Sequence, residues 1–178
     1  MKISGEYLVE ADQQKVWDAL NDTAVLKQCI PGCQSIDWVG DDDMEATVGS
    51  VVGPLKLTMK GRVKRSNIAP PESYTLSGEG SAGPAGHVSG VADVRLSRES
   101  EALTRLNYDV SVTIGGKLAQ VGSKLVEGTA KRQADQFFRA FSDVVSGRAP
   151  SPKKRMGLIL AIGLAALIAL AAIIYMAF

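Results

Sequence analysis

Histidine and cysteine are scarce in this chain of 178 residues. His87 is the only histidine, and Cys29 and Cys33 are the only cysteines. A metal site needs several such ligands, or carboxylates, that converge on one point. Two thiols with no third ligand near them therefore favour packing around a turn, with a soft-metal site as the alternative. His87 has no serine or cysteine at the spacing of a catalytic triad, so acid–base use of His87 is the weaker interpretation.

The chain also lacks a net charge of either sign. Its 20 lysines and arginines balance 19 aspartates and glutamates, which leaves a formal charge of +1. Nucleic-acid-binding domains concentrate basic residues on one face, whereas here they are spread along the chain, apart from the triplet Lys153, Lys154 and Arg155. The composition therefore argues against a nucleic-acid partner.

Residues 156–178 contain no charged side chain at all. At about 1.5 Å per residue, a helix of this length reaches roughly 34 Å, enough to cross a hydrocarbon core of about 30 Å. The basic triplet at 153–155 precedes it, and the positive-inside rule then places the rest of the chain in the cytoplasm. We expect a single-pass tail anchor in the cytoplasmic membrane, with Lys153, Lys154 and Arg155 at the anionic lipid surface. A buried core helix is the alternative.

Between this segment and the body lies a stretch rich in glycine, proline and serine. Residues 147–155 include Pro150 and Pro152, and an extended linker of this length spans at most about 28 Å. The sequence therefore predicts three parts: a single domain over 1–146, a basic linker over 147–155, and a transmembrane anchor over 156–178.

Most of the body shows the alternation of half-buried strands. In residues 1–10, every second side chain is apolar or small, and the run from Leu55 to Val63 alternates with Lys56, Thr58, Lys60 and Arg62. Further strands are expected near 44–52, 73–80, 87–97 and 103–114. Two short helices are expected before them, one capped by Asp12 and one over 23–28.

After Gly115 and Gly116 the period becomes helical. Leu118, Gly122 and Leu125 fall on one face, which Thr129, Phe137 and Phe141 continue. The pattern predicts one helix of about 30 residues. Burying its single apolar stripe requires a curved sheet, so the fold class is α+β, a curved antiparallel sheet around a long C-terminal helix.

Glycines are concentrated between residues 78 and 90. The letters from Gly78 to Gly83 match the dinucleotide-binding fingerprint, but that fingerprint must open a helix, and here another strand is expected to follow. The favoured interpretation is a glycine-rich hairpin, which would give any cavity beside it a thin or mobile wall.

These features together resemble the START-like, or SRPBCC, helix-grip fold, and more narrowly the family of carbon monoxide dehydrogenase G subunits. The resemblance rests on four stretches: VWDALNDTAVLKQCIPGCQSI, VGPLKL, YTLSGEGSAGPAGHVSG and GGKLAQVGSKLVEGTAKRQADQFF. It implies a non-enzymatic protein that accompanies a molybdenum-containing dehydrogenase at the cytoplasmic membrane.

The resemblance also favours a cavity between helix and sheet over simple close packing. The expected apolar lining is Tyr7, Val48, Leu57, Met59, Leu76, Val94, Tyr108, Val110, Leu118, Gly122 and Leu125. An apolar pocket with two tyrosine hydroxyls suits a hydrophobic ligand with one or two carbonyl or hydroxyl groups. Because the dehydrogenase must pass electrons to the respiratory chain, we expect a respiratory quinone, either menaquinone or ubiquinone, as the carried ligand. The alternatives are a purely structural anchor for the dehydrogenase and a START-like lipid carrier or cyclase.

Overall fold

The computed structural model describes residues 1–148. The expected transmembrane segment at 156–178, the triplet Lys153, Lys154 and Arg155, and most of the linker lie outside the described residues. Within residues 1–148, none of the helices combines the length and the apolar character that a membrane crossing requires.

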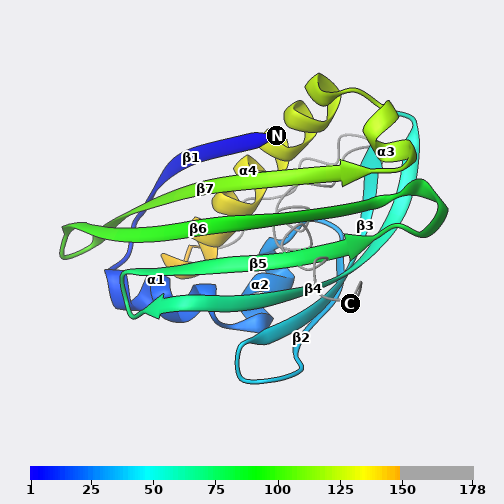
Figure 1. Cartoon of the computed structure of the whole chain (residues 1–178). Coiled ribbons are helices and arrows are strands. Elements are labelled where there is room, and N and C mark those ends of the chain that lie inside the picture. Colours follow the sequence, from blue (N-terminus) through cyan, green and yellow to red (C-terminus); the bar gives the residue numbers. More distant parts are fainter. Residues whose placement is uncertain (149–178) are drawn as a thin grey trace.

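Seven antiparallel strands form one sheet in the order β1-β7-β6-β5-β4-β3-β2 (Figure 1). The strands are β1 (Lys2–Val9), β2 (Cys33–Trp38), β3 (Asp43–Val52), β4 (Leu55–Ala69), β5 (Ser73–Ser81), β6 (His87–Ser100) and β7 (Leu103–Gly115). Each strand from β2 to β6 pairs with its successor in the chain, and β1 pairs with β7 at the edge of the sheet. The expected antiparallel sheet is confirmed.

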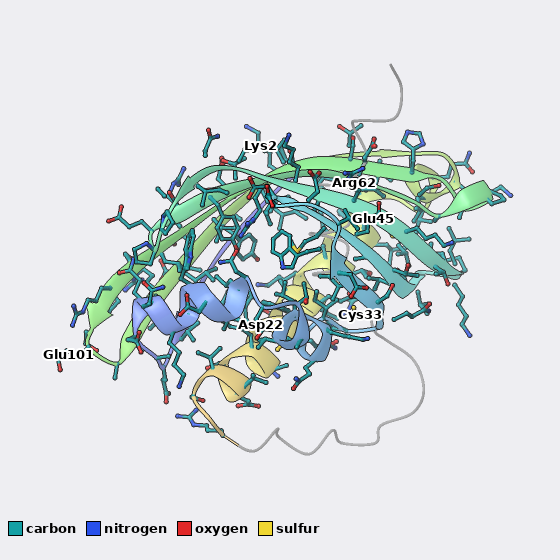
Figure 2. All side chains as sticks on the ribbon, turned by 90° about the horizontal axis from the view of Figure 1, so that it is seen from below. Lys2, Asp22, Cys33, Glu45, Arg62 and Glu101 are labelled. Carbon is teal, nitrogen blue, oxygen red and sulfur yellow. The ribbon has the colours of Figure 1, made fainter. Side chains whose placement is uncertain are left out.

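Three helices matter for the core: α1 (Gln13–Leu20), α2 (Thr23–Cys29) and α4 (Ser123–Val145). They lie together on the concave side of the sheet, which arches over them in Figure 2. Both short helices begin as the sequence predicts, because the Asp12 carboxylate accepts from the backbone of Lys15, and that of Asp22 accepts from Ala24 and Val25. Such caps satisfy backbone donors that a helix leaves free at its first turn.

The two faces of the sheet follow the alternation in the sequence. On β4, Leu57, Met59 and Val63 are buried, whereas Thr58, Lys60 and Arg62 between them are exposed. Arg62 on the same strand and Glu45 on β3 stand on the convex side in Figure 2. The apolar core therefore lies between the concave face and the helices.

The predicted single helix of about 30 residues is wrong. The structure has a four-residue helix, α3 (Lys117–Gln120), and then α4, with Gly122 at a φ of +97° between them. Because this positive φ turns the chain, the helical phase of Leu118 does not continue into α4. Leu118 is buried, but Leu125 is 53 % exposed, and a Cβ added at Gly122 would meet nothing within 4 Å.

Two other details of the chain complete the sheet. The glycine-rich stretch is a hairpin, as expected: β5 and β6 are joined by a short 3-10 turn, η1 (Gly83–Ala85), and no dinucleotide-type helix follows β5. Strand β2 was not predicted, because its sequence CQSIDW lacks a clean alternation of apolar and polar residues. In the structure its pairing with β3 is also irregular, with a register shift between Cys33 and Ser35.

Candidate ligand cavity

A cavity lies between the concave face of the sheet and the helices. Its walls come from the inner positions of five strands, from α4, from the C-terminal end of α1 and from α2. The lining residues are Leu20, Asn21, Leu26, Met44, Arg65, Tyr74, Leu76, Ala92, Val94, Leu106, Tyr108, Val110, Phe137 and Phe138. Most of these side chains are apolar, and all except Asn21, Arg65 and Val94 are buried. The cavity therefore offers a largely apolar surface with few polar groups.

The cavity is small. The centre of a water molecule can reach about 60 Å³ of it, whereas an apolar cavity of about 150 Å³ is known to admit benzene. A ligand with an aromatic or quinone ring therefore fits only if the walls move apart. The described conformation is too narrow for such a ring.

Stacked aromatic rings form one wall. Phe138 on α4 stacks on Tyr7 of β1 with ring centroids 4.0 Å apart, and on Tyr108 of β7 at 5.8 Å. Behind this wall, the Tyr7 hydroxyl donates a hydrogen bond of 2.5 Å to the Asp135 carboxylate. Burial, followed by the bond to Asp135, raises the pKa of Tyr7 above its usual range, so this hydroxyl stays protonated near neutral pH.

The polar edge of the cavity is built around Arg65. Its Nη1 donates to the side-chain oxygen of Asn21, and its Nη2 donates to the carbonyl of Asp41 and to the carboxylate of Asp42, the last at 2.9 Å. The guanidinium also lies 4.3 Å from the centre of the Trp38 ring, a favourable cation–π distance. Arg65 thus ties the α1–α2 connection to the β2–β3 hairpin at the edge of the cavity.

Two tyrosines, Tyr74 and Tyr108, belong to this mostly apolar lining. Burial raises the pKa of Tyr74, and the charge of Arg65 partly opposes that shift. Burial also raises the pKa of Tyr108. Both hydroxyls therefore remain neutral and can donate hydrogen bonds at physiological pH.

Four of the eleven residues predicted to line a pocket do line this cavity: Leu76, Val94, Tyr108 and Val110. Tyr7 stands behind Phe138. Four others belong to the buried core outside the lining, namely Val48, Leu57, Met59 and Leu118. The placement of Gly122 and Leu125 against the cavity was wrong, because Gly122 precedes α4 and Leu125 points to solvent.

Arg65 is the residue that sequence reasoning missed and that matters most. The inner positions of β4 are Leu57, Met59, Gly61 and Val63, and the next inner position is Arg65. Extending the period-two pattern by one step reaches a cation on the buried face of a strand. Burying a charge costs free energy unless the charge is paired. The pattern could therefore have identified Arg65 as a residue with a special role.

Cysteine and histidine play no visible part in the cavity. Cys29 is buried, which raises the pKa of its thiol to about 11, and burial also raises the pKa of Cys33. Neither Cys29, Cys33 nor His87 lines the cavity. Within residues 1–148, no three potential ligands among histidine, cysteine, aspartate and glutamate come together as a metal would require.

A family model for the G subunit of carbon monoxide dehydrogenase (CoxG) matches residues 5–146. The chain belongs to the CoxG family. No curated protein matches it.

Solved structures share the fold. A conserved protein from Geobacillus kaustophilus is 27% identical, with a TM-score of 0.78 over 83% of this chain and 96% of its own. A START superfamily protein from Mycobacterium smegmatis is 13% identical, with a TM-score of 0.65 over 82% and 97%. The ZhuI aromatase/cyclase from Streptomyces sp. R1128 is 14% identical, with a TM-score of 0.61 over 82% and 93%. The fold of residues 1–148 is therefore START-like.

Proposed function

We propose that this CoxG-family protein is a non-enzymatic adaptor that holds a molybdenum-containing dehydrogenase at the cytoplasmic membrane and binds a respiratory quinone in its cavity. The observation that carries the ligand-binding part is the narrow apolar cavity, which is lined by side chains from five strands and α4 with a few polar groups among them. Small-molecule sites have this composition, with an apolar lining and a few placed hydrogen-bonding groups.

The partner and the location rest on the family and the sequence. The family is named for its association with carbon monoxide dehydrogenase, and the uncharged segment 156–178 is long enough for a membrane anchor. A linker of about 28 Å at full extension keeps the cavity near the bilayer. Quinones dissolved in that bilayer are the electron acceptors closest to such a tethered domain.

Recruitment and ligand binding call for separate experiments. Deleting residues 156–178 is expected to release the partner dehydrogenase into the soluble fraction while its activity with an artificial acceptor stays intact. Because the deletion leaves residues 1–148 untouched, it tests the anchor alone. A dehydrogenase that stays on the membrane in the deletion strain would contradict the adaptor function.

Ligand binding is tested by filling the cavity from within. Ala92 on β6 lines the cavity and is 4 % exposed, whereas its neighbour Val91 points outward and is 38 % exposed. Ala92→Leu is expected to exclude a ligand at a cost of about 1–3 kcal/mol or less, and Val91→Leu serves as the control of matched position. Mass spectrometry of organic extracts should then find isoprenoid quinone with wild type and Val91→Leu, and much less with Ala92→Leu.

The structural anchor is the competing function. If wild-type protein purified from quinone-containing membranes carries no quinone, while the tail deletion still releases the dehydrogenase, the protein is an anchor only. If quinone or lipid is bound but the dehydrogenase stays where it was, the protein is a carrier with another role.

A further inference from the structure

One nitrogen of Arg65 is unused. The Nε of Arg65 is buried and has no hydrogen-bond partner, while Nη1 and Nη2 are both engaged by the α1–α2 connection and the β2–β3 hairpin. Arg65 also lines the cavity. Buried donors are nearly always paired in folded proteins, so an unpaired N–H on a residue that lines the cavity can take an acceptor from a ligand once the walls move apart.

The rest of the guanidinium is held in place. Asp42 neutralises its charge at 2.9 Å, Asn21 accepts from its other end, and Trp38 supports one of its faces. A group fixed in this way by its partners is preorganised and loses little freedom when a ligand binds. The remaining Nε–H is therefore a rigid, single donor.

We propose that the Nε–H of Arg65 recognises a neutral acceptor oxygen on an apolar ligand, that is, a ketone or quinone carbonyl in preference to a carboxylate or a plain hydrocarbon. The proposal rests on the function proposed above and specifies the chemistry of its ligand. It makes Arg65 the residue that determines specificity in a lining that is otherwise mostly apolar.

The preference for a neutral oxygen follows from charge. Asp42 already neutralises Arg65, so a carboxylate placed in the cavity would meet no free positive charge and would lose its hydration. A carbonyl needs only one N–H to be satisfied, and its ring or chain can lie against Leu76, Val94 and the aromatic wall. A hydrocarbon gains the same apolar contacts but leaves the Nε–H unpaired.

The test uses the full chain reconstituted in saturated phosphatidylcholine nanodiscs, with empty nanodiscs to correct for partitioning. The probes are 2,3-dimethyl-1,4-naphthoquinone, 2,3-dimethylnaphthalene and 2-naphthoate, which share a ring skeleton but differ in oxygen chemistry. The methyl groups on the quinone block addition of the two cysteine thiols. Binding is measured by equilibrium dialysis, and the wild type is expected to prefer the quinone over both other probes by about tenfold or more.

Arg65→Met is the test variant, and Arg62→Met is its control. Arg62 lies on the same strand but on the convex face, 52 % exposed, and its Nε pairs with Asp43 at 3.3 Å (Figure 2). Arg65→Met is expected to weaken quinone binding about tenfold, or about 1.4 kcal/mol, while hydrocarbon binding changes less than about twofold. Arg62→Met should leave both affinities within about twofold of wild type.

A second measurement needs no variant. The carbonyl stretching band of the bound quinone in the wild type is expected at lower wavenumber than in empty nanodiscs, because a donated hydrogen bond weakens the C=O bond. An unshifted band would overturn the Arg65 proposal even if Arg65→Met failed to fold.

The outcomes separate the two proposals. If the wild type binds none of the probes, the ligand-binding function itself fails. If it binds quinone and hydrocarbon equally, or if Arg65→Met weakens the binding of both equally, the cavity still binds apolar ligands. Arg65 then forms no hydrogen bond that distinguishes an oxygen-bearing ligand. Tighter binding of 2-naphthoate than of the quinone would show an anion site in place of a neutral one.

Discussion

The hydroxyl of Tyr7, near the start of the chain, donates a hydrogen bond of 2.5 Å to the carboxylate of Asp135, which lies 128 positions later on α4. The ring of Tyr7 stacks on Phe138 at the same time, and Phe138 lines the cavity. The pair therefore fixes the aromatic wall of the cavity by joining the edge strand β1 to α4.

Removing the Tyr7 hydroxyl should weaken this junction. Tyr7→Phe keeps the stacked ring but leaves Asp135 without its donor, and we expect the free energy of unfolding to fall by about 1–2 kcal/mol. Asp135→Asn keeps an acceptor oxygen and should cost less. Urea unfolding of the three proteins measures the effect, and a Tyr7→Phe midpoint equal to that of wild type would show that the bond contributes nothing to stability.

The tyrosines also predict how stability depends on alkaline pH. Burial raises the pKa values of Tyr7, Tyr74 and Tyr108 on folding, so above pH 10 the unfolded chain releases protons that the folded chain retains. The stability contributed by these groups is complete below about pH 10 and decreases as the pH rises further. Urea unfolding between pH 8 and pH 11 should show a flat region followed by a decline, which the absorbance of tyrosinate near 295 nm should match. Ionisation of all tyrosines near pH 10 in the folded protein would contradict this.

The fold was largely predictable because its main signals are local. Alternation along residues 55–63 predicted one face of β4 correctly, since Leu57 and Val63 are buried, and Asp12 predicted the start of α1. The break at Gly122 could not be predicted from periodicity, because helical spacing continues across it in the sequence while the φ of +97° changes direction in space.

The site was predictable only in part. Leu76 and Val110 were identified because inward positions of central strands face the core of any curved sheet. Which part of that core stays open depends on how α4 packs against the sheet. Phe138 lines the cavity, but the predicted long helix placed Phe137 and Phe141 on its apolar face and not Phe138. The ion pair between Arg65 and Asp42 joins residues that are 23 positions apart in the sequence. No local sequence pattern predicts such a contact.

Enlarging the cavity should convert it into a site for a small aromatic ring. Phe138→Ala is expected to cost about 3–5 kcal/mol of stability and to open space beside the existing cavity. Phe141→Ala on the same helix is the control, because Phe141 is fully buried at 0 % exposure but does not line the cavity. Benzene should raise the melting temperature of Phe138→Ala more than that of Phe141→Ala, because only the space left by Phe138 adds to an existing cavity. Equal shifts would mean that the cavity does not extend to Phe138.

Gly5 of β1 should tolerate no side chain, because the ring of Tyr108 lies across its backbone. The two residues are opposite each other in the β1–β7 register, and a Cβ at Gly5 would lie 2.4 Å from the Tyr108 hydroxyl oxygen and 2.6 Å from the ring carbon that bears it. Gly5→Ala must therefore displace the ring, which also stacks with Phe138, and we expect the free energy of unfolding to fall by about 1–3 kcal/mol.

Gly128→Ala provides a control of opposite sign. Gly128 lies inside α4, where a Cβ would meet only the end of the Arg132 side chain at 3.5 Å, so alanine should stabilise the protein by about 0.5–1 kcal/mol. Thermal and urea unfolding of both variants test the pair, and a Gly5→Ala protein as stable as wild type would mean that Tyr108 can leave the cavity wall without cost.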